Sequence, residues 1–279
     1  MSRAAAAALL VLCVAAPART APDPRYPWLG SVDFAQTLAA RLPPPPGFAR
    51  EPTPAGSFAA WLRGLPLKPG TPPVYLHDGR RKANQAAHAA VLDVDVGRRD
   101  LQQCADAVMR LRAEYLYAAK RPAAIHFNFT SGHEAAFPRW ARGDRPVVAG
   151  NSVRWTRQAR ADATYPSLRR YLEVVFRYAG TASLTKELVV ARVEEIQPGD
   201  VFIRGGAPGH AVIVLDVAAA PGGGERRFLL AQSYMPAQDI HVLKNPGDPR
   251  LSPWYATSFG QVLVTPEWVF RRDELKRWR

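Results

Sequence analysis

The stretch GGAPGHAVIVLDVA, residues 205–218, joins a glycine- and proline-rich loop to a long apolar run. Such a run, bounded by residues that end regular structure, is typical of a strand buried in a core sheet. The strand begins with His210, and a core sheet does not need a titratable ring at that position. The stretch therefore predicts a buried strand with a candidate functional residue at its start.

Other segments indicate how this strand is surrounded. DLQQCADAVMRLRAEYLYAAK (100–120) contains no glycine or proline, and Asp100 is its expected N-cap. We expect a helix there, with a buried stripe at helical spacing formed by Leu101, Cys104, Val108, Leu111 and Tyr115. The last third of the chain is rich in predicted strands, at 200–206, 210–218, 227–234, 239–243 and 260–265, with a hairpin loop at 218–227. The sequence thus predicts an α+β fold in which a long helix packs on an antiparallel sheet.

A proline-rich region at 19–73 precedes the main α+β domain, which we place at 74–279. We expect this region to wrap over the domain through a short helix in SFAAWLRGLPL (57–67), anchored by Phe58, Trp61 and Leu62. We also expect strands at 89–97 and 124–132, a short interrupted helix at 134–143, a long surface loop at 142–165 and a helix at 165–180.

The first residues have the pattern of a secretory signal peptide. A basic Arg3 precedes an apolar stretch, which ends in small residues that predict cleavage after Ala18. We therefore expect residues 1–18 to be a leader and the protein to be exported to the periplasm or beyond. Leu12 disfavours lipidation of Cys13, because it is too bulky for the usual lipidation site. No later segment is long and apolar enough to span a membrane.

The formal net charge is +13. Outside the cytoplasm such a charge favours anionic envelope polymers over nucleic acid, and no basic run is interleaved with aromatic residues as in a nucleic-acid-binding face. A solvated basic surface without a partner is the simpler interpretation. Nothing in the sequence predicts an oligomer, so we expect a monomer.

After removal of the leader, Cys104 is the only cysteine, so no internal disulfide can form. Its predicted place in the first turn of a helix favours a thiolate, because unpaired backbone N–H groups and the helix dipole stabilise negative charge there. The same position lies on the apolar stripe, and cysteine is among the most buried residue types. Both a nucleophile and an inert core residue remain open.

A cysteine nucleophile needs a base, and the base needs a group that orients it. His210 is the candidate base, and the amide oxygen of Gln232 is our choice to accept from its ring, with Ser233 and Asp239 as alternatives. The Cys104 amide, with Gln103, would form an oxyanion hole. Further candidates for contact with a substrate are Gly209, Ser233, Tyr234, His126 and Asn128. The six histidines lack metal-binding spacing, so we predict no metal and no cofactor.

The segment IQPGDVFIRGGAPGHAVIVLDVA (196–218) resembles the Gly-Asp strand, loop and Gly-His strand of the NlpC/P60 and CHAP cysteine peptidases. In those families a cysteine at a helix start comes first, a histidine on a strand follows, and a third polar residue lies on the next strand. Cys104, His210 and Gln232 occur in that order. The resemblance implies a papain-like (NlpC/P60-type) fold. Gln103-Cys104-Ala105 departs from the usual Cys-Ser or Cys-Thr pair, and glutamine is an unusual third residue.

Longer strings resemble the bacterial domain-of-unknown-function 4846 family, among them DVGRRDLQQCADAVMRLRAEYLY (95–117) and LAQSYMPAQDIHVLKNP (230–246). This resemblance implies an exported bacterial protein and supplies no activity.

Two functions are therefore expected. The first is an exported papain-like cysteine hydrolase, an amidase or peptidase acting on cell-wall peptides through a Cys104–His210 dyad. The second is a catalytically inactive scaffold of the same kind that binds an envelope glycan or peptide.

Overall fold

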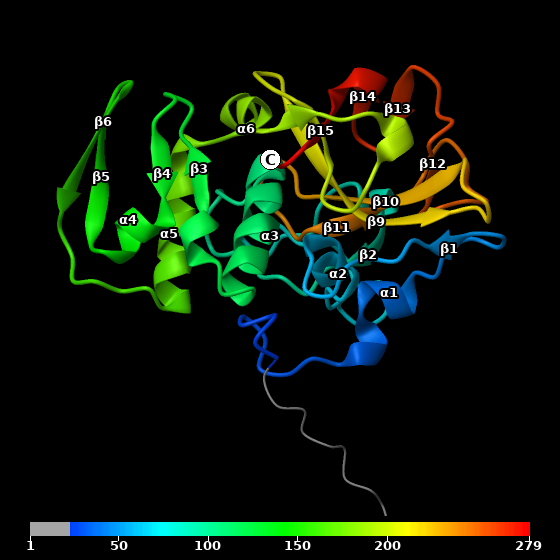
Figure 1. Cartoon of the computed structure of the whole chain (residues 1–279), viewed down its shortest axis with the longest axis horizontal. Helices are drawn as coiled ribbons and strands as arrows, with labels where there is room; N and C mark the ends of the chain where they lie inside the picture. The colour runs from blue at the N-terminus through cyan, green and yellow to red at the C-terminus, as the bar shows by residue number, and fades with distance from the viewer. Residues whose placement is uncertain (1–22) are drawn as a thin grey trace, which may run out of the picture.

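The chain is described from residue 23 to residue 279 in a computed structural model. The predicted leader at 1–18, Cys13 included, lies outside the described residues. The molecule is mixed α/β, with one large antiparallel sheet and several separate hairpins (Figure 1).

The large sheet has nine strands in the order β2-β11-β10-β9-β8-β15-β7, with β1 added to β9 and β12 added to β10. Every pairing in it is antiparallel. Its strands are β1 (Ala49–Arg50), β2 (His88–Val91), β7 (Val189–Val190), β8 (Val201–Arg204), β9 (His210–Ala219), β10 (Arg226–Gln232), β11 (His241–Leu243), β12 (Tyr255–Ala256) and β15 (Leu275–Arg277). The strands predicted in the last third of the chain are present, and β9 is the longest of them.

Strand β9 lies inside the large sheet, between β10 and β8, and both of its faces are apolar. Ala211 and Ile213 contribute to the larger hydrophobic cluster, and Val212 and Val214 contribute to a second cluster on the opposite face. Nine of the ten residues of β9 are buried, which a strand reaches only when both faces of its sheet are covered.

The helices are α1 (Leu38–Arg41), α2 (Phe58–Arg63), α3 (Cys104–Ala118), α4 (Phe137–Ala141), α5 (Tyr165–Tyr178) and α6 (Thr181–Glu187). Helix α3 packs on β9, with further contacts to β10, α2 and α6. It lies near the middle of the molecule, between the sheet and a region built from α4, α5 and the strands within residues 126–157 (Figure 1). The predicted long helix on a sheet is thus present, although this packing alone does not establish a papain-like fold.

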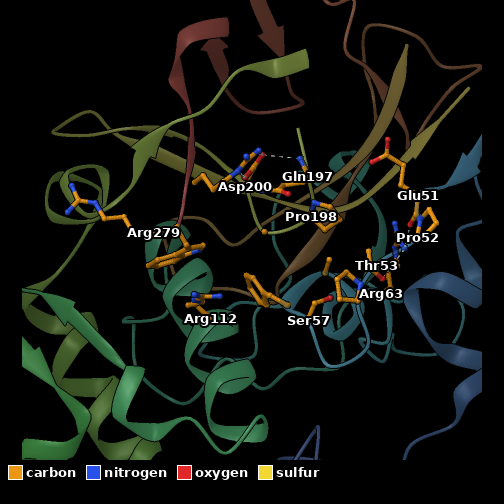
Figure 2. A pocket seen from close by; sticks show the side chains of 16 residues that line it. Glu51, Pro52, Thr53, Ser57, Arg63, Arg112, Gln197, Pro198, Asp200 and Arg279 are labelled. Carbon is orange, nitrogen blue, oxygen red and sulfur yellow. Dashed lines mark hydrogen bonds and ion pairs between the residues drawn. The ribbon is translucent and has the colours of Figure 1, made fainter. Parts of the chain in front are cut away.

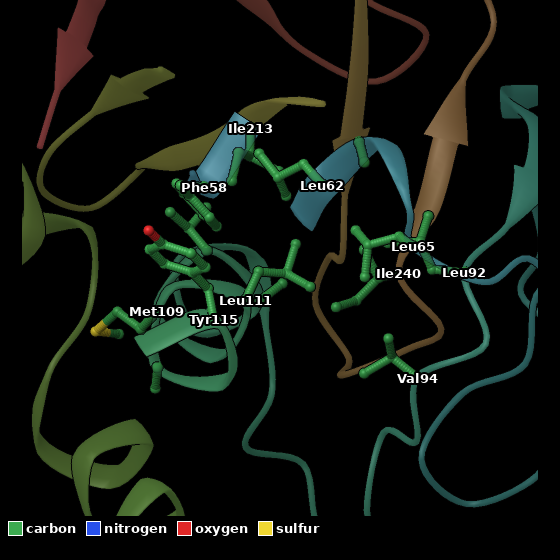
Figure 3. Close-up of a cluster of buried hydrophobic side chains, with 14 of the residues drawn as sticks. Phe58, Leu62, Leu65, Leu92, Val94, Met109, Leu111, Tyr115, Ile213 and Ile240 are labelled. Carbon is green, nitrogen blue, oxygen red and sulfur yellow. The ribbon is translucent and has the colours of Figure 1, made fainter. Parts of the chain in front are cut away.

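The proline-rich region lies against the core. Phe58, Trp61 and Leu62 of α2 are buried in the cluster that also contains Leu111 and Tyr115 of α3 and Ile213 of β9 (Figure 3). Two arginines of this region, Arg50 and Arg63, pair with the fully buried carboxylate of Asp216 on β9, each at 2.5 Å.

Three predictions of local structure were wrong. Residues 142–165 are not a loop throughout, because β5 (Asp144–Ala149) and β6 (Ser152–Arg157) form a hairpin. The many basic and polar residues of this segment gave no clear strand pattern. The strand predicted at 89–97 is β2, which ends at Val91, and beyond it Leu92 forms only an isolated bridge with Leu67. Helix α3 begins at Cys104 with Gln103 as its N-cap, because the Asp106 carboxylate accepts the Gln103 N–H at 3.0 Å, and Asp100 does not cap it.

Smaller sheets complete the fold. Hairpin β3–β4 (His126–Asn128 and Glu134–Ala136) contains the strand predicted at 124–132, in shorter form, and its second strand replaces the first residues of the helix expected at 134–143. Hairpin β13–β14 (Val262–Val264 and Val269–Arg271) covers the face of β9 that is opposite α3, where Phe270 joins the second hydrophobic cluster.

Candidate functional site

Cys104 lies in the first turn of α3, as the sequence predicted, and is its first residue, but its side chain is only 7% exposed. Burial raises the pKa of the thiol to about 11, and the Asp106 carboxyl adds to this shift. The backbone amide of Ala211, next to His210 in the chain, interacts with the sulfur and opposes the shift without reversing it. The thiol is therefore neutral near pH 7, and the stabilisation expected from the helix N-terminus does not overcome the loss of solvation.

His210 is also buried, with 2% exposure, and its ring lies among aromatic side chains. The ring centroids of Tyr234, Trp268 and Phe270 lie 4.7, 5.3 and 5.9 Å from that of His210. Burial lowers the pKa of the imidazole to about 4, so the ring is neutral at physiological pH. A neutral ring is the form that a general base requires.

The ring of His210 is oriented by Gln232. Its Nε2 donates to the Gln232 amide oxygen at 2.8 Å, and the Gln232 amide nitrogen donates to Glu267 at 2.7 Å. Glu267 in turn pairs with Lys82 at 2.5 Å. A buried chain of polar groups therefore runs from β9 through β10 to the loop of the β13–β14 hairpin.

The two alternatives to Gln232 are engaged elsewhere. The Ser233 hydroxyl lies between two carbonyl oxygens, those of Gln102 and Gln238, at 2.9 Å from each. The Asp239 carboxylate pairs with Lys68 and accepts the Tyr75 N–H. Gln232 is thus the one of the three predicted candidates that contacts His210.

Cys104 and His210 approach the start of β9 from different sides. Successive side chains of a strand point to opposite faces. Ala211 faces the cluster that contains α3, whereas the His210 ring stacks on Phe270 of the opposite cluster. No hydrogen bond joins the Cys104 sulfur to the His210 ring within residues 23–279.

The remaining predicted residues are dispersed. Gln103 caps α3, and its side-chain amide donates to Asp100 at 3.0 Å. A side chain at Gly209 would meet the Gly206 carbonyl oxygen at 2.4 Å, so tight packing of the loop requires this glycine. His126 and Asn128 lie on β3, away from Cys104, and line a separate cavity of about 300 Å³.

Two cavities lie on either side of Arg112, a residue of α3 that the sequence did not single out. The larger, of about 330 Å³, lies between α2, α3 and the turn at 197–200. Figure 2 shows Arg112 and Ser57 on one side of it and Gln197, Pro198 and Asp200 on the other. The other cavity is the one lined by His126 and Asn128. Trp278 and Arg279 line both cavities as well.

Aromatic rings surround the Arg112 guanidinium, with the centroids of Phe58, Trp278 and Tyr115 at 5.2, 5.4 and 5.6 Å from its central carbon. It forms no ion pair and no hydrogen bond with any residue of the described chain. Burial and the nearby charge of Arg121 lower its pKa. No motif marks Arg112, because only the tertiary fold brings Trp278 and Phe58 to it.

Other kinds of site find less support in residues 23–279. No group of three or more histidine, cysteine, aspartate or glutamate side chains there is placed to hold a metal ion. None of the helices in this part of the chain is both long enough and apolar enough to cross a bilayer.

The structure defines a mixed α/β protein with a buried polar chain behind its central strand and a cationic, aromatic-lined region beside α3. The chain belongs to the family described as Domain of unknown function (4846), whose model matches residues 38–277. No curated protein and no solved structure matches it, so the resemblance to the NlpC/P60 and CHAP peptidases gains no support.

Proposed function

We propose that this protein binds an anionic glycan or peptide of the cell envelope without cleaving it. The observation that carries the proposal is the Arg112 guanidinium, which lines two cavities and has no acidic partner among the described residues. A half-buried cation without a counter-ion is costly, and a carboxylate or phosphate would satisfy it with charge-assisted hydrogen bonds.

The surroundings of Arg112 suit such a ligand. Arg279 lines both cavities and Arg121 lines the smaller one, and neither forms an ion pair within the described chain. Phe58 and Trp278 add apolar surface beside these charges, which suits a sugar ring or a peptide side chain. The net charge of +13 would attract anionic polymers toward the molecule.

The test is binding of soluble muropeptides by calorimetry, comparing the native protein with Arg112→Gln. Loss of a charge-assisted hydrogen bond of about 1.5–3 kcal/mol should weaken binding roughly 10- to 100-fold. Arg80→Gln is the matched control, because it removes the same charge from an exposed turn. Equal affinity of the native protein and Arg112→Gln would refute the proposal. Cleavage of the muropeptides by the protein would also refute it.

The cysteine hydrolase remains a second candidate, and the hydrogen bond from His210 to Gln232 is the observation that favours it. Cys104 would attack an amide carbonyl, and His210 would take the thiol proton and return it to the leaving amine. In this reaction the amide bond breaks, a thioester forms, and water then releases the acid.

Thiol labelling separates the two candidates. With the pKa of Cys104 raised from 9.0 to about 11, its thiolate fraction at pH 7 should be roughly 100-fold below that of an ordinary cysteine. Iodoacetamide should therefore modify the native protein far more slowly than the denatured protein. Rapid modification of native Cys104 below pH 7 would support the hydrolase instead.

A further inference from the structure

We propose that the cavity on the β3 side of Arg112 takes a ligand carrying both a carboxylate and an ammonium group, such as a peptide or amino acid. Arg112 faces the carboxylate and Glu187 faces the ammonium group. This proposal rests on the anionic site at Arg112 and adds to it the class of ligand.

The cavity is assembled from distant parts of the chain. It is lined by Arg112 and Leu116 of α3, His126 and Asn128 of β3, Glu134 of β4, Lys186 and Glu187 of α6, and by Arg121, Ala124, Trp278 and Arg279. Its volume of about 300 Å³ lies at the lower end of the range for small-molecule sites. A ligand of several carbon atoms between two charged groups fits this size.

Glu187 ends α6, and its carboxylate has one protein partner within the described chain. Its Oε1 accepts the backbone N–H of Asn128 at 2.7 Å, and no lysine or arginine of residues 23–279 pairs with it. Burial raises the pKa of this carboxyl to about 7, and the nearby Glu134 adds to the shift. A positive group brought to the carboxylate would relieve this unfavourable environment.

Arg112 and Glu187 have opposite charges and line one cavity, yet they form no ion pair with each other. Lys186 and Arg121 also line the cavity, and neither forms an ion pair with Glu187. Opposite charges within reach of each other would pair in a partly buried site. The cavity therefore keeps a cation and an acid apart, and a ligand with both charges would satisfy them together.

The test uses a series of ω-amino acids of three to eight carbons and the unsubstituted carboxylic acids of the same lengths. Binding is measured by calorimetry at pH 8, where the Glu187 carboxyl is mostly ionised. The native protein should bind the amino acid of optimal length at least tenfold more tightly than its matched acid. In Glu187→Gln this preference should disappear while the acids bind at least as tightly as before, because the variant removes a like charge from the cavity and its glutamine still accepts the Asn128 N–H.

Three further variants show which residues cause the preference for amino acids. Arg112→Gln should lose both classes of ligand, whereas Glu173→Gln, on an exposed face of α5, should keep the native preference. Equal binding of amino acids and acids by the native protein, with both lost in Arg112→Gln, would overturn this inference and leave the anionic site intact. Loss of the preference in Glu134→Gln instead of Glu187→Gln would also overturn it. Failure of every ligand to bind would overturn the anionic site as well.

Discussion

At the scale of the residue, His210 shows how far a buried histidine depends on its neighbours. Aromatic rings remove water from the imidazole, and Gln232 holds the proton on its Nε2. The pKa falls from 6.5 to about 4 because burial disfavours the charged ring more than the nearby Glu267 favours it. The ring therefore stays neutral in the folded protein at a pH where it would be protonated in the unfolded chain.

This difference predicts an acid-dependent loss of stability. Well above pH 6.5 the ring is neutral in both the folded and the unfolded state, so its pKa shift does not change the free energy of unfolding. As the pH falls from 6.5 toward 4, His210 becomes protonated in the unfolded chain but stays neutral in the folded protein. The free energy of unfolding therefore decreases. Between pH 8 and pH 5 the contribution of His210 is about 2 kcal/mol.

Chemical denaturation at the two pH values measures the effect. The native protein should lose about 2 kcal/mol more than His210→Gln over this interval. His133→Gln serves as the control, because that histidine is exposed and its variant should follow the native protein. If His210→Gln and the native protein lose the same free energy, the His210 ring titrates normally in the folded protein.

At the scale of the element, α3 departs from the amphipathic helix that the sequence predicted. Twelve of its residues are buried, charged ones included, so no face of the helix is left to solvent over most of its length. Arg110 is fully buried and donates to Glu114 at 2.5 Å, to Gln102 at 2.9 Å and to Asp95 at 3.0 Å. These charged and polar groups form a buried network, and Asp106 takes no part in it.

Breaking this network should destabilise the protein strongly. Arg110→Met leaves the fully buried Glu114 without its cation, which predicts a loss of about 3–5 kcal/mol in the free energy of unfolding. The double variant Arg110→Met/Glu114→Leu removes both charges and should recover much of that loss. Arg99→Met is the control, because its pair with Glu173 is exposed and should be worth at most about 1 kcal/mol.

Urea denaturation of the four proteins checks this prediction. A loss below about 1 kcal/mol in Arg110→Met would show that Glu114 is solvated or protonated without its partner, and that the network does not stabilise α3.

At the scale of the whole molecule, the proline-rich region is part of the core and not an appendage. Asp216 of β9 accepts ion pairs from Arg50 and Arg63, and the indole N–H of Trp28 donates to the carbonyl of Asp93 at 2.6 Å. These contacts join residues more than sixty positions apart in the chain. They also shape the larger Arg112 cavity, because Phe58 and Ser57 of the same region form one of its walls.

The sequence by itself determined the strands of the last third and the place of Cys104 in the first turn of its helix, and it favoured Gln232 over Ser233 and Asp239 as the partner of His210. Each follows from signals along the chain: apolar runs of strand length, a helix without glycine or proline, and polar residues at the start of one strand and the end of the next, which meet at one edge of an antiparallel sheet. Those signals act over a few residues, so they can be read without knowing the fold.

Only the tertiary structure decided which of these groups meet and how deeply each is buried. Cys104 and His210 follow the expected order along the chain, yet the pleat of β9 turns Ala211 toward α3 and His210 toward the opposite face. Arg112 and Glu187 carry no local signal, and they share a cavity because α3 and α6 pack together. Burial and long-range contact are properties of the packed molecule, and they set the charge and the reactivity of each side chain.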